Sequence, residues 1–566
     1  MKIGKFSFFA IICCLLLGLV WTISAYAQPQ PGSVTREVDR KVRQEVQKEM
    51  RPTAPTKPPI EEAEEKEEVP KGPKFFCKNI ILTGTESFPS EDFEPIIEKY
   101  ENREVHLGDL NTLAKEIERD YLKKGIISAC YVPPQEVRSG VVTLTVVEAK
   151  MGELIIKDHK WYDKERLEYY WTIRPGEVLR YNEMARILYE MNKNADRTVK
   201  STLAAGKKPG TTDVILEAET KFPVHVSATY DKEGAVASGR ERKGIGLRHN
   251  NFLFADDILI TGYNYGKEFW GLYGYHSIQL TPFGTWVMYG YSYSRSHPKK
   301  EYASSDLDSR SENSSGFVHQ DLFMKGKYIG EVYAGMDAKD KTTRIVSGTV
   351  TRDRLRILRF GGNFILEGPG RVTYFHTELS QGINGFGARR KSSLSSRGAG
   401  NTFFAVEADM NHRLALPLGI QGVVKLAGQV AGERLTPQEE FSLGGLDSVR
   451  GYPNGDFLAD NAFQSNFEML FPIAFFLPDS WELPFDGGRI KDTVTGVTFF
   501  DYAYGEKRGM RPFEMKGMNL ASIGTGLRMR FYDKFTMRLE WGFITGDKSL
   551  TESAESRFHI SLDLRI

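Results

Sequence analysis

The sequence contains few cysteines, and two of them lie in a segment that we expect to be removed. Only four occur in 566 residues. Cys13 and Cys14 fall inside an apolar N-terminal run and lack the Leu-small-small-Cys arrangement of a lipoprotein site. Cys77 and Cys130 remain in the mature chain. Two cysteines of an exported protein can form one disulfide, but the sequence leaves open whether their Cβ atoms are close enough.

An excess of one charge and the motifs of nucleotide or metal chemistry are also missing. The formal net charge is +1, so no strong electrostatic field attracts the chain to nucleic acid. The sequence has no G-x-x-x-x-G-K-[ST] loop, no H-E-x-x-H and no paired C-x-x-C. We therefore expect no nucleic-acid partner, no cofactor and no metal site.

Long hydrophobic runs are confined to the N-terminus, and elsewhere no segment approaches the ~18 apolar residues of a transmembrane helix. The N-terminal run begins after Lys2 and Lys5 and is followed by a small-residue site ending at Ala27, which predicts a signal peptide over residues 1–27. A retained membrane anchor is the alternative. The mean hydropathy of −0.38 fits a soluble exported protein. It also fits a membrane β-barrel, whose apolar lipid-facing residues alternate with polar lumenal ones.

Residues 28–73 predict one short helix on a flexible linker. Val38, Val42, Val46 and Met50 are spaced four apart and form a narrow apolar stripe on a helix that is otherwise charged. The proline-rich stretch RPTAPTKPP ends that helix, because proline denies it backbone donors. The acidic run EEAEEKEE that follows is typical of a solvated segment.

Residues 74–150 and 151–220 repeat one order of elements. In the first copy we expect strands at FFCKNIILTG, IISACYV and VVTLTVVEA and helices at SEDFEPIIEKY and GDLNTLAKEIERDYLKKG. The second copy reads GELIIKD, DKERLEYYW, YNEMARILYEMNKN, VKSTLAAG and TDVILEAET. Two tandem α+β units of βααββ order are an internal repeat. Each packs its helices on one face of a sheet and leaves an edge strand that can accept a strand from a partner.

Residues 221–566 lose the helical period and predict a transmembrane antiparallel β-barrel. Strand candidates follow one another, separated by turns and by longer polar loops such as 296–315 and 381–401. The final stretch RFHISLDLRI alternates strictly, with apolar residues on one face and polar residues on the other, as a strand that closes a barrel would. The span has room for roughly 16 strands of about 10 residues. A soluble sandwich or a propeller is the alternative.

Near the end of this region, the turn-rich stretch LGGLDSVRGYPNGDF at 443–457 contains a single arginine, Arg450. Downstream, Phe499, Asp501 and Ala503 share one face of a strand. A carboxylate there must face the lumen, because facing lipid is costly. A guanidinium can pair with it bidentately. We therefore expect loop 443–457 to fold back into the barrel and Arg450 to dock on Asp501.

These features resemble the outer-membrane transporter superfamily that includes BamA and, within it, the two-partner-secretion branch ShlB/FhaC/HecB. In that branch the βααββ units are called POTRA domains, two of them lie in the periplasm, and a 16-stranded barrel follows. The loop motif of the branch falls on Val449, Arg450, Gly451 and Tyr452. The resemblance covers nearly the whole mature chain.

Two positions depart from the motifs of the branch. Its F-x-D-x-G strand motif falls on Phe499 and Asp501, but Ala503 replaces the glycine. The terminal aromatic of the family is Ile566 here. The stretch YVPPQEVRSGVVTLTVVEAKMGELII at 131–156 also resembles the first POTRA domain of the branch.

The resemblance implies a non-enzymatic protein transporter in the outer membrane of a Gram-negative cell. It would capture an unfolded exported protein on its periplasmic POTRA domains and pass that protein through the barrel to the cell surface. Its partners would be this substrate and outer-membrane lipid, and it would act as a monomer. The stripe at 38–50 would belong to a helix that plugs the pore. In the second POTRA domain, helix 181–194 and strand 199–206 would form the docking surface.

Three other functions remain open from the sequence. An assembly factor of the same superfamily would insert outer-membrane proteins, and a passive porin would need no periplasmic repeats. A barrel lipase would use His559 and Ser561, which share one strand face. The apolar residues Phe558, Ile560 and Leu562 are expected to face lipid on that strand, so His559 and Ser561 are expected to point inward.

Overall fold

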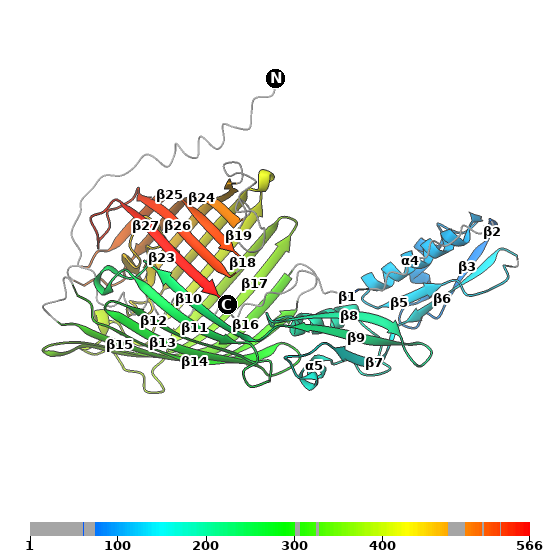
Figure 1. Cartoon of the computed structure of the whole chain (residues 1–566), viewed down its shortest axis with the longest axis horizontal. Helices are drawn as coiled ribbons and strands as arrows, with labels where there is room; N and C mark the ends of the chain where they lie inside the picture. Colours follow the sequence, from blue (N-terminus) through cyan, green and yellow to red (C-terminus); the bar gives the residue numbers. More distant parts are fainter. Residues whose placement is uncertain are drawn as a thin grey trace, which may run out of the picture.

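Two small α/β units lead into a closed β-barrel, and the C-terminus lies on the last barrel strand (Figure 1). The computed structural model describes residues 60–61, 74–137, 139–299, 306–323, 328–473, 493–511, 514–532 and 534–566. The expected signal peptide and the apolar stripe Val38, Val42, Val46 and Met50 lie outside the described residues. Among the helices within these ranges, none is long and apolar enough to cross a membrane.

The first unit is a small sheet covered on one face by helices. In chain order its elements are β2 (Phe75–Cys77), β3 (Asn79–Thr83), η1 (Ser90–Phe93), α3 (Glu94–Ile97), β4 (Arg103–Val105), α4 (Leu107–Lys123), β5 (Ser128–Tyr131) and β6 (Val141–Glu148). The sheet has the order β3-β6-β5, with β3 parallel to β6. Helix α4 buries Leu110, Leu113, Ile117 and Tyr121, the apolar face that their spacing predicts.

The structure divides the first predicted strand, FFCKNIILTG, at Lys78. The backbone amides of Lys78 and Asn79 both donate to the carbonyl of Gly140, at 2.7 and 3.3 Å. Gly140 has φ +74°, and a Cβ there would lie 2.9 Å from the carbonyl oxygen of Phe76. Two neighbouring amides on one acceptor interrupt the ladder, so β2 pairs with β4 and only β3 joins the sheet.

The second unit also has helices beside a sheet, and this sheet has four strands where the main sheet of the first unit has three. Its elements are β7 (Lys150–Lys157), α5 (Lys164–Tyr170), α6 (Tyr181–Met191), β8 (Arg197–Ala205) and β9 (Thr211–Thr220). The sheet order is β1-β8-β9-β7, in which β1 (Ile60–Glu61) lies parallel to β8 opposite Ser201 and Thr202. Part of the β8 edge, where the sequence predicts that a partner could add a strand, is therefore paired with a segment of the same chain.

The barrel closes on itself with sixteen antiparallel strands, the number that the sequence predicts. They are β10 (Val224–Asp231), β11 (Arg242–His249), β12 (Ile258–Gly266), β13 (Phe269–Gln279), β14 (Thr285–Ser296), β15 (Asp308–Phe323), β16 (Tyr328–Ile345), β17 (Gly348–Gly368), β18 (Arg371–Gly382), β19 (Phe404–Ala415), β20 (Gln421–Ala431), β23 (Asn461–Pro472), β24 (Val494–Glu506), β25 (Gly517–Phe531), β26 (Phe535–Ile544) and β27 (Ser556–Arg565). The last strand pairs with the first, from Ser227 opposite Arg565 to Asp231 opposite Ser561.

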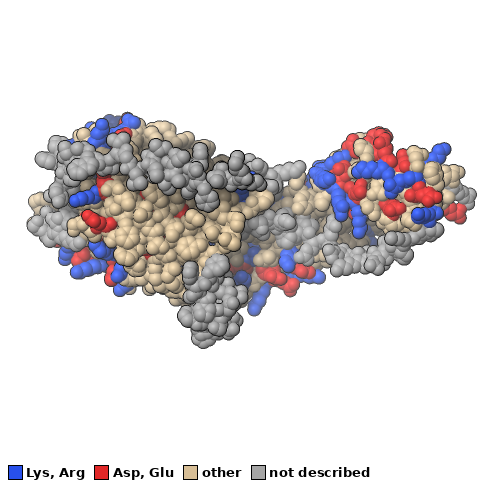
Figure 2. Space-filling model, turned by 90° about the horizontal axis from the view of Figure 1, so that it is seen from above, with Lys and Arg blue, Asp and Glu red and all other residues tan. Residues whose placement is uncertain are grey.

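The two faces of the barrel wall differ in polarity as a membrane barrel requires. On β27, Phe558 is 55% exposed on the outside, whereas His559 is fully buried on the inside. The face of the barrel in Figure 2 is mostly uncharged, while charged side chains of both signs cover the α/β units. Apolar residues outside and polar residues inside are the pattern of an outer-membrane barrel, not of a soluble sandwich.

One expected loop is in part a strand. Residues 296–315 were expected to form a polar loop, but β15 begins at Asp308. Its residues Ser309, Ser311 and Asn313 are all buried on the inner side of the wall. A lumen-facing strand needs polar residues at every second position, so polar composition here did not indicate a loop.

Candidate functional site

The connection between β20 and β23 enters the barrel instead of projecting outward. A short hairpin, β21 (Phe441–Leu443) with β22 (Phe457–Ala459), forms its stem. Residues 443–457, here called the inward loop, continue from this hairpin, and almost all of them are buried. Val449 and Tyr452 are both fully buried, in one apolar cluster with Leu443. The loop is thus packed against the inner wall.

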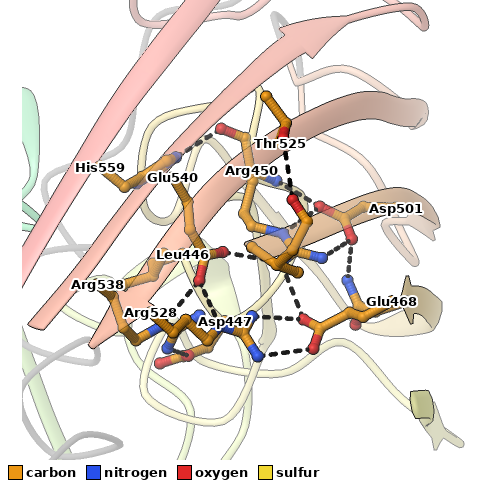
Figure 3. A network of polar contacts seen from close by, with 12 residues as sticks. Leu446, Asp447, Arg450, Glu468, Asp501, Thr525, Arg528, Arg538, Glu540 and His559 are labelled. Atoms are coloured by element: carbon orange, nitrogen blue, oxygen red, sulfur yellow. Dashed lines mark hydrogen bonds and ion pairs between the residues drawn. The ribbon is translucent and has the colours of Figure 1, made fainter. Parts of the chain in front are cut away.

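Arg450, at the tip of the inward loop, contacts three carboxylates on three strands (Figure 3). Its backbone amide, Nε and Nη2 donate to Asp501 on β24, at 3.0, 2.8 and 2.6 Å. Nη1 donates to Glu468 on β23 and to Glu540 on β26, both at 2.8 Å. The guanidinium lies over the ring of Phe499, 3.5 Å from its centroid. The structure therefore brings the two predicted motifs into direct contact.

Further charged side chains surround this contact and balance it. Arg528 donates to both Glu468 and Glu540, and Arg538 donates to Glu540. Lys425 pairs with Glu468 at 3.2 Å. Since removing one partner of a buried ion pair leaves an uncompensated charge, each member of the network depends on the others.

Glycines let the loop backbone approach the wall closely. A Cβ on Gly542 of β26 would lie 2.6 Å from the carbonyl carbon of Arg450, and one on Gly451 would lie 2.9 Å from the Cβ of Ser522. Ala503 stands where the family motif has a glycine, and a nearby glycine allows the close approach instead. Gly505 lies at the next inward position, where a Cβ would be 2.7 Å from Leu443. The alanine itself is fully buried in the apolar cluster.

Two side chains of the inward loop, those of Tyr452 and Asp456, join it to the connection between β26 and β27. The hydroxyl of Tyr452 donates to the carbonyl of Asp547 at 2.6 Å. The carboxylate of Asp456 accepts hydrogen bonds from the hydroxyl groups of Ser549 and Thr551, at 2.9 and 2.6 Å. The part of the loop that follows Arg450 is thus held to this connection, and Tyr452 of the predicted motif contributes directly.

His559 supports the loop and is not arranged for hydrolysis. One ring nitrogen contacts the carbonyl oxygen of Arg450 at 2.5 Å, and the other contacts Glu233 at 2.7 Å. Glu233 belongs to the β10–β11 connection and also accepts the backbone amide of Leu446 at 3.1 Å. The two ring nitrogens, which a lipase would need for proton transfer, thus contact Glu233 and the backbone of the inward loop.

Sequence reasoning placed Arg450 and Asp501 but missed Glu468, Glu540 and Glu233. Glu468 and Glu540 are single acidic residues on strands, each between two apolar neighbours. That pattern marks a lumen-facing carboxylate, and it is the signal from which both could have been found.

A second set of buried polar contacts joins the second unit to the mouth of the barrel. Arg197 at the start of β8 pairs with Asp256 in the β11–β12 turn at 2.7 Å. Tyr170 and Asn194 also donate to Asp256, each at 2.7 Å. Burial opposes the ionisation of Asp256, but the charge and the hydrogen bond of Arg197 outweigh it, so the pKa of this carboxyl lies below its ordinary value.

The β13–β14 turn, the next turn at the same end of the barrel, is held by the same unit. Arg166 of α5 donates to the carbonyl of Gln279 at 3.0 Å, and Arg186 of α6 donates to that of Pro282 at 2.8 Å. Gln279 in turn donates to Glu190 at 2.8 Å. The β11–β12 and β13–β14 turns, which follow one another at this end of the barrel, are therefore both fixed to the second unit.

The two cysteines whose pairing the sequence left open are both free and buried in the first unit. Burial, together with the nearby charge of Glu118, raises the pKa of the Cys130 thiol to about 12. Burial also raises the pKa of Cys77. Both side chains act as small apolar residues of the core.

Comparison with known proteins places these features in one family. The model of the haemolysin secretion/activation protein ShlB/FhaC/HecB matches residues 210–498, and that of the ShlB-type POTRA domain matches residues 75–149. The outer membrane transporter CdiB of Dickeya dadantii is 22% identical over 457 residues, which are 78% of this chain and 80% of CdiB. The heme/hemopexin transporter protein HuxB of Haemophilus influenzae is 22% identical over 568 residues, 93% of each chain.

Solved structures share the fold. CdiB from Escherichia coli superposes with a TM-score of 0.71 at 17% identity, covering 96% of this chain and all of that one. BamA from Haemophilus ducreyi, lacking POTRA domains 1–3, has a TM-score of 0.56 at 12% identity and is matched over 87% of this chain. The chain belongs to the ShlB/FhaC/HecB family, whose members are outer-membrane β-barrel transporters of two-partner secretion with POTRA domains in the periplasm.

Proposed function

We propose that this transporter captures an unfolded exported protein on its two periplasmic units and delivers it directly into the barrel. The contact between Arg197 and Asp256 carries the proposal, because it fixes the second unit at the barrel mouth. A substrate bound to that unit stays at the entrance of the lumen, so it need not diffuse to find the entrance. The barrel closes within one chain, which supports a functional monomer embedded in lipid.

The capture surface that we propose is the edge of β8, where a substrate would add as a strand. The helical part of the docking surface expected from the sequence has little free area, because Met184, Ile187, Leu188 and Met191 of α6 are core residues. The edge of β8 offers backbone donors and acceptors, although β1 pairs with it at Ser201 and Thr202. An incoming strand would extend this edge or displace β1.

The inward loop would hold the wall strands in register or would gate the channel. Arg450 links β23, β24 and β26 through one side chain, so a shift of any of these strands disturbs all its contacts. The route needs no nucleotide, and folding of the substrate outside the cell would supply the driving force.

Transport is tested by expressing the chain together with a candidate exported protein, chosen because its gene neighbours that of the transporter, in a Gram-negative host that lacks both. We expect the exported protein at the cell surface or in the medium only when the transporter is present. Retention in the periplasm, together with altered amounts of other outer-membrane proteins, would instead identify a general assembly factor.

Capture is tested separately by placing a photo-cross-linking residue at Thr198 or Ala205, the exposed ends of β8. Glu165, exposed on α5, is the matched control position. We expect adducts with the exported protein at both β8 positions and none at Glu165. Adducts of equal yield at all three positions would contradict capture at this edge.

A further inference from the structure

A second segment folds inward beside the inward loop and carries its own buried arginine. Residues 383–403 connect β18 to β19 on the same end of the barrel and contain a short turn, η4 (Ser396–Gly398). Arg397 in this turn is only 4% exposed. Its φ of +52° lies in the left-handed region, which a residue with a side chain adopts at a cost in free energy. The contacts of this side chain offset that cost.

Arg397 contacts both ends of the β21–β22 hairpin, which is the stem of the inward loop. Its Nη1 donates to Glu440 at 2.5 Å and to Asp460 at 3.0 Å. Glu440 directly precedes β21 and Asp460 directly follows β22, and both are fully buried. One guanidinium therefore bridges the start and the end of the hairpin stem.

Other contacts fix this bridge from neighbouring segments. Nε of Arg397 donates to Glu514 in the β24–β25 connection at 3.0 Å. Asp460 also accepts the backbone amides of Leu435 and Arg508, both at 2.7 Å. None of the carboxylates that Arg397 contacts is among the three that Arg450 contacts. The stem and the tip of the inward loop thus have separate anchors.

We propose that Arg397 is a positioning residue that clamps the stem of the inward loop, independently of the anchor that Arg450 provides at its tip. The segment 383–403 and the inward loop then move as one unit. A chain that leaves the barrel at this end passes beside both, or displaces both. The clamp does not depend on which protein is carried.

Single cysteines in the full-length protein report on the two anchors separately. Ser442 in the stem is 4% exposed and Ser448 near the tip is fully buried, so a cysteine at either position should react slowly with a membrane-impermeant maleimide added to intact cells. The protein without an introduced cysteine gives the background. Arg397→Gly removes the guanidinium and keeps the backbone conformation, because glycine adopts positive φ without strain.

In Arg397→Gly we expect the cysteine at 442 to react at least tenfold faster and the cysteine at 448 to stay slow. Arg450→Ala should give the reverse. Arg390→Ala removes an exposed arginine from the same segment and should change neither rate. Unchanged labelling at 442 in Arg397→Gly, or equal acceleration at both positions, overturns the proposal.

Heat-modifiable migration on a denaturing gel establishes that each variant forms a folded barrel. If Arg397→Gly does not accumulate as a folded barrel, Arg397→Lys tests the clamp instead. Lysine keeps the charge but lacks the planar fork that reaches several carboxylates. We then expect a smaller acceleration, still confined to position 442, and labelling like that of the parent at both positions contradicts the clamp.

Discussion

Removing either partner of the Arg450–Asp501 contact should destabilise the barrel, and the two losses should not add. Arg450→Ala leaves Asp501 buried without its cation, and the loss of one partner of a buried ion pair typically costs about 4 kcal/mol. Asp501→Ala leaves Arg450 with Glu468 and Glu540, so we expect a smaller loss of about 3 kcal/mol.

In the double variant neither charge remains to be compensated. We therefore expect a loss of about 5 kcal/mol, which is a coupling of about 2 kcal/mol relative to the sum of the single losses. The free energy of unfolding is measured by urea titration of the purified barrel in lipid vesicles, with heat-modifiable migration as the readout.

The exposed pair Arg565–Asp563 provides the control for this cycle. Its side chains are 45% and 26% exposed, so Arg565→Ala should cost less than about 0.5 kcal/mol. Losses that add within about 0.5 kcal/mol in the Arg450/Asp501 double variant would refute an energetic link between the two residues.

Three further predictions concern a glycine in the barrel wall, the contact between the second unit and the barrel, and the cysteines. Gly542→Ala places a Cβ 2.6 Å from the backbone of Arg450 and should lower the free energy of unfolding by about 2 kcal/mol, whereas Gly316→Ala, with open space around its Cβ, should not lower it. Because the pKa of Asp256 lies below 3.8, its contact with Arg197 should be complete above about pH 4 and weaken as the pH falls through that lowered pKa, measured as the distance between spin labels on the second unit and the barrel. Cys77 and Cys130 are both free, so the electrophoretic mobility of a chain that contains these two cysteines should be the same with and without reductant, and a shift would indicate a disulfide.

Alternation of residues along a strand was the feature that the sequence made easiest to interpret. On β27 the apolar and polar residues take separate faces, so the inward direction of His559 could be predicted. The inward direction of Asp501 on β24 followed instead from the cost of a carboxylate that faces lipid. The same reasoning failed at β15, because a strand whose inner face is serine and asparagine has the composition of a loop. Periodicity predicts which way a side chain points, and it carries no information about what lies opposite.

That limit explains the missed members of the site. Glu468 and Glu540 meet Arg450 only because β23, β24 and β26 are neighbours or near neighbours in a closed wall. The distance between them depends on strand register, which a single sequence does not specify. His559 and Glu233 are 326 residues apart in sequence and meet only because β27 pairs with β10.

The chemistry of the two anchors is compatible with the proposed gating, in which the inward loop moves. A buried ion pair adds little net stability compared with an apolar contact of the same size, because both charges must leave water to form it. For the same reason, water that enters the lumen stabilises the separated charges and lowers the cost of opening the contact. Opening an apolar anchor would instead cost free energy in proportion to the apolar area that becomes exposed to water. We therefore expect the contacts of Arg450 at the tip and of Arg397 at the stem to persist in a closed barrel and to weaken as its lumen hydrates.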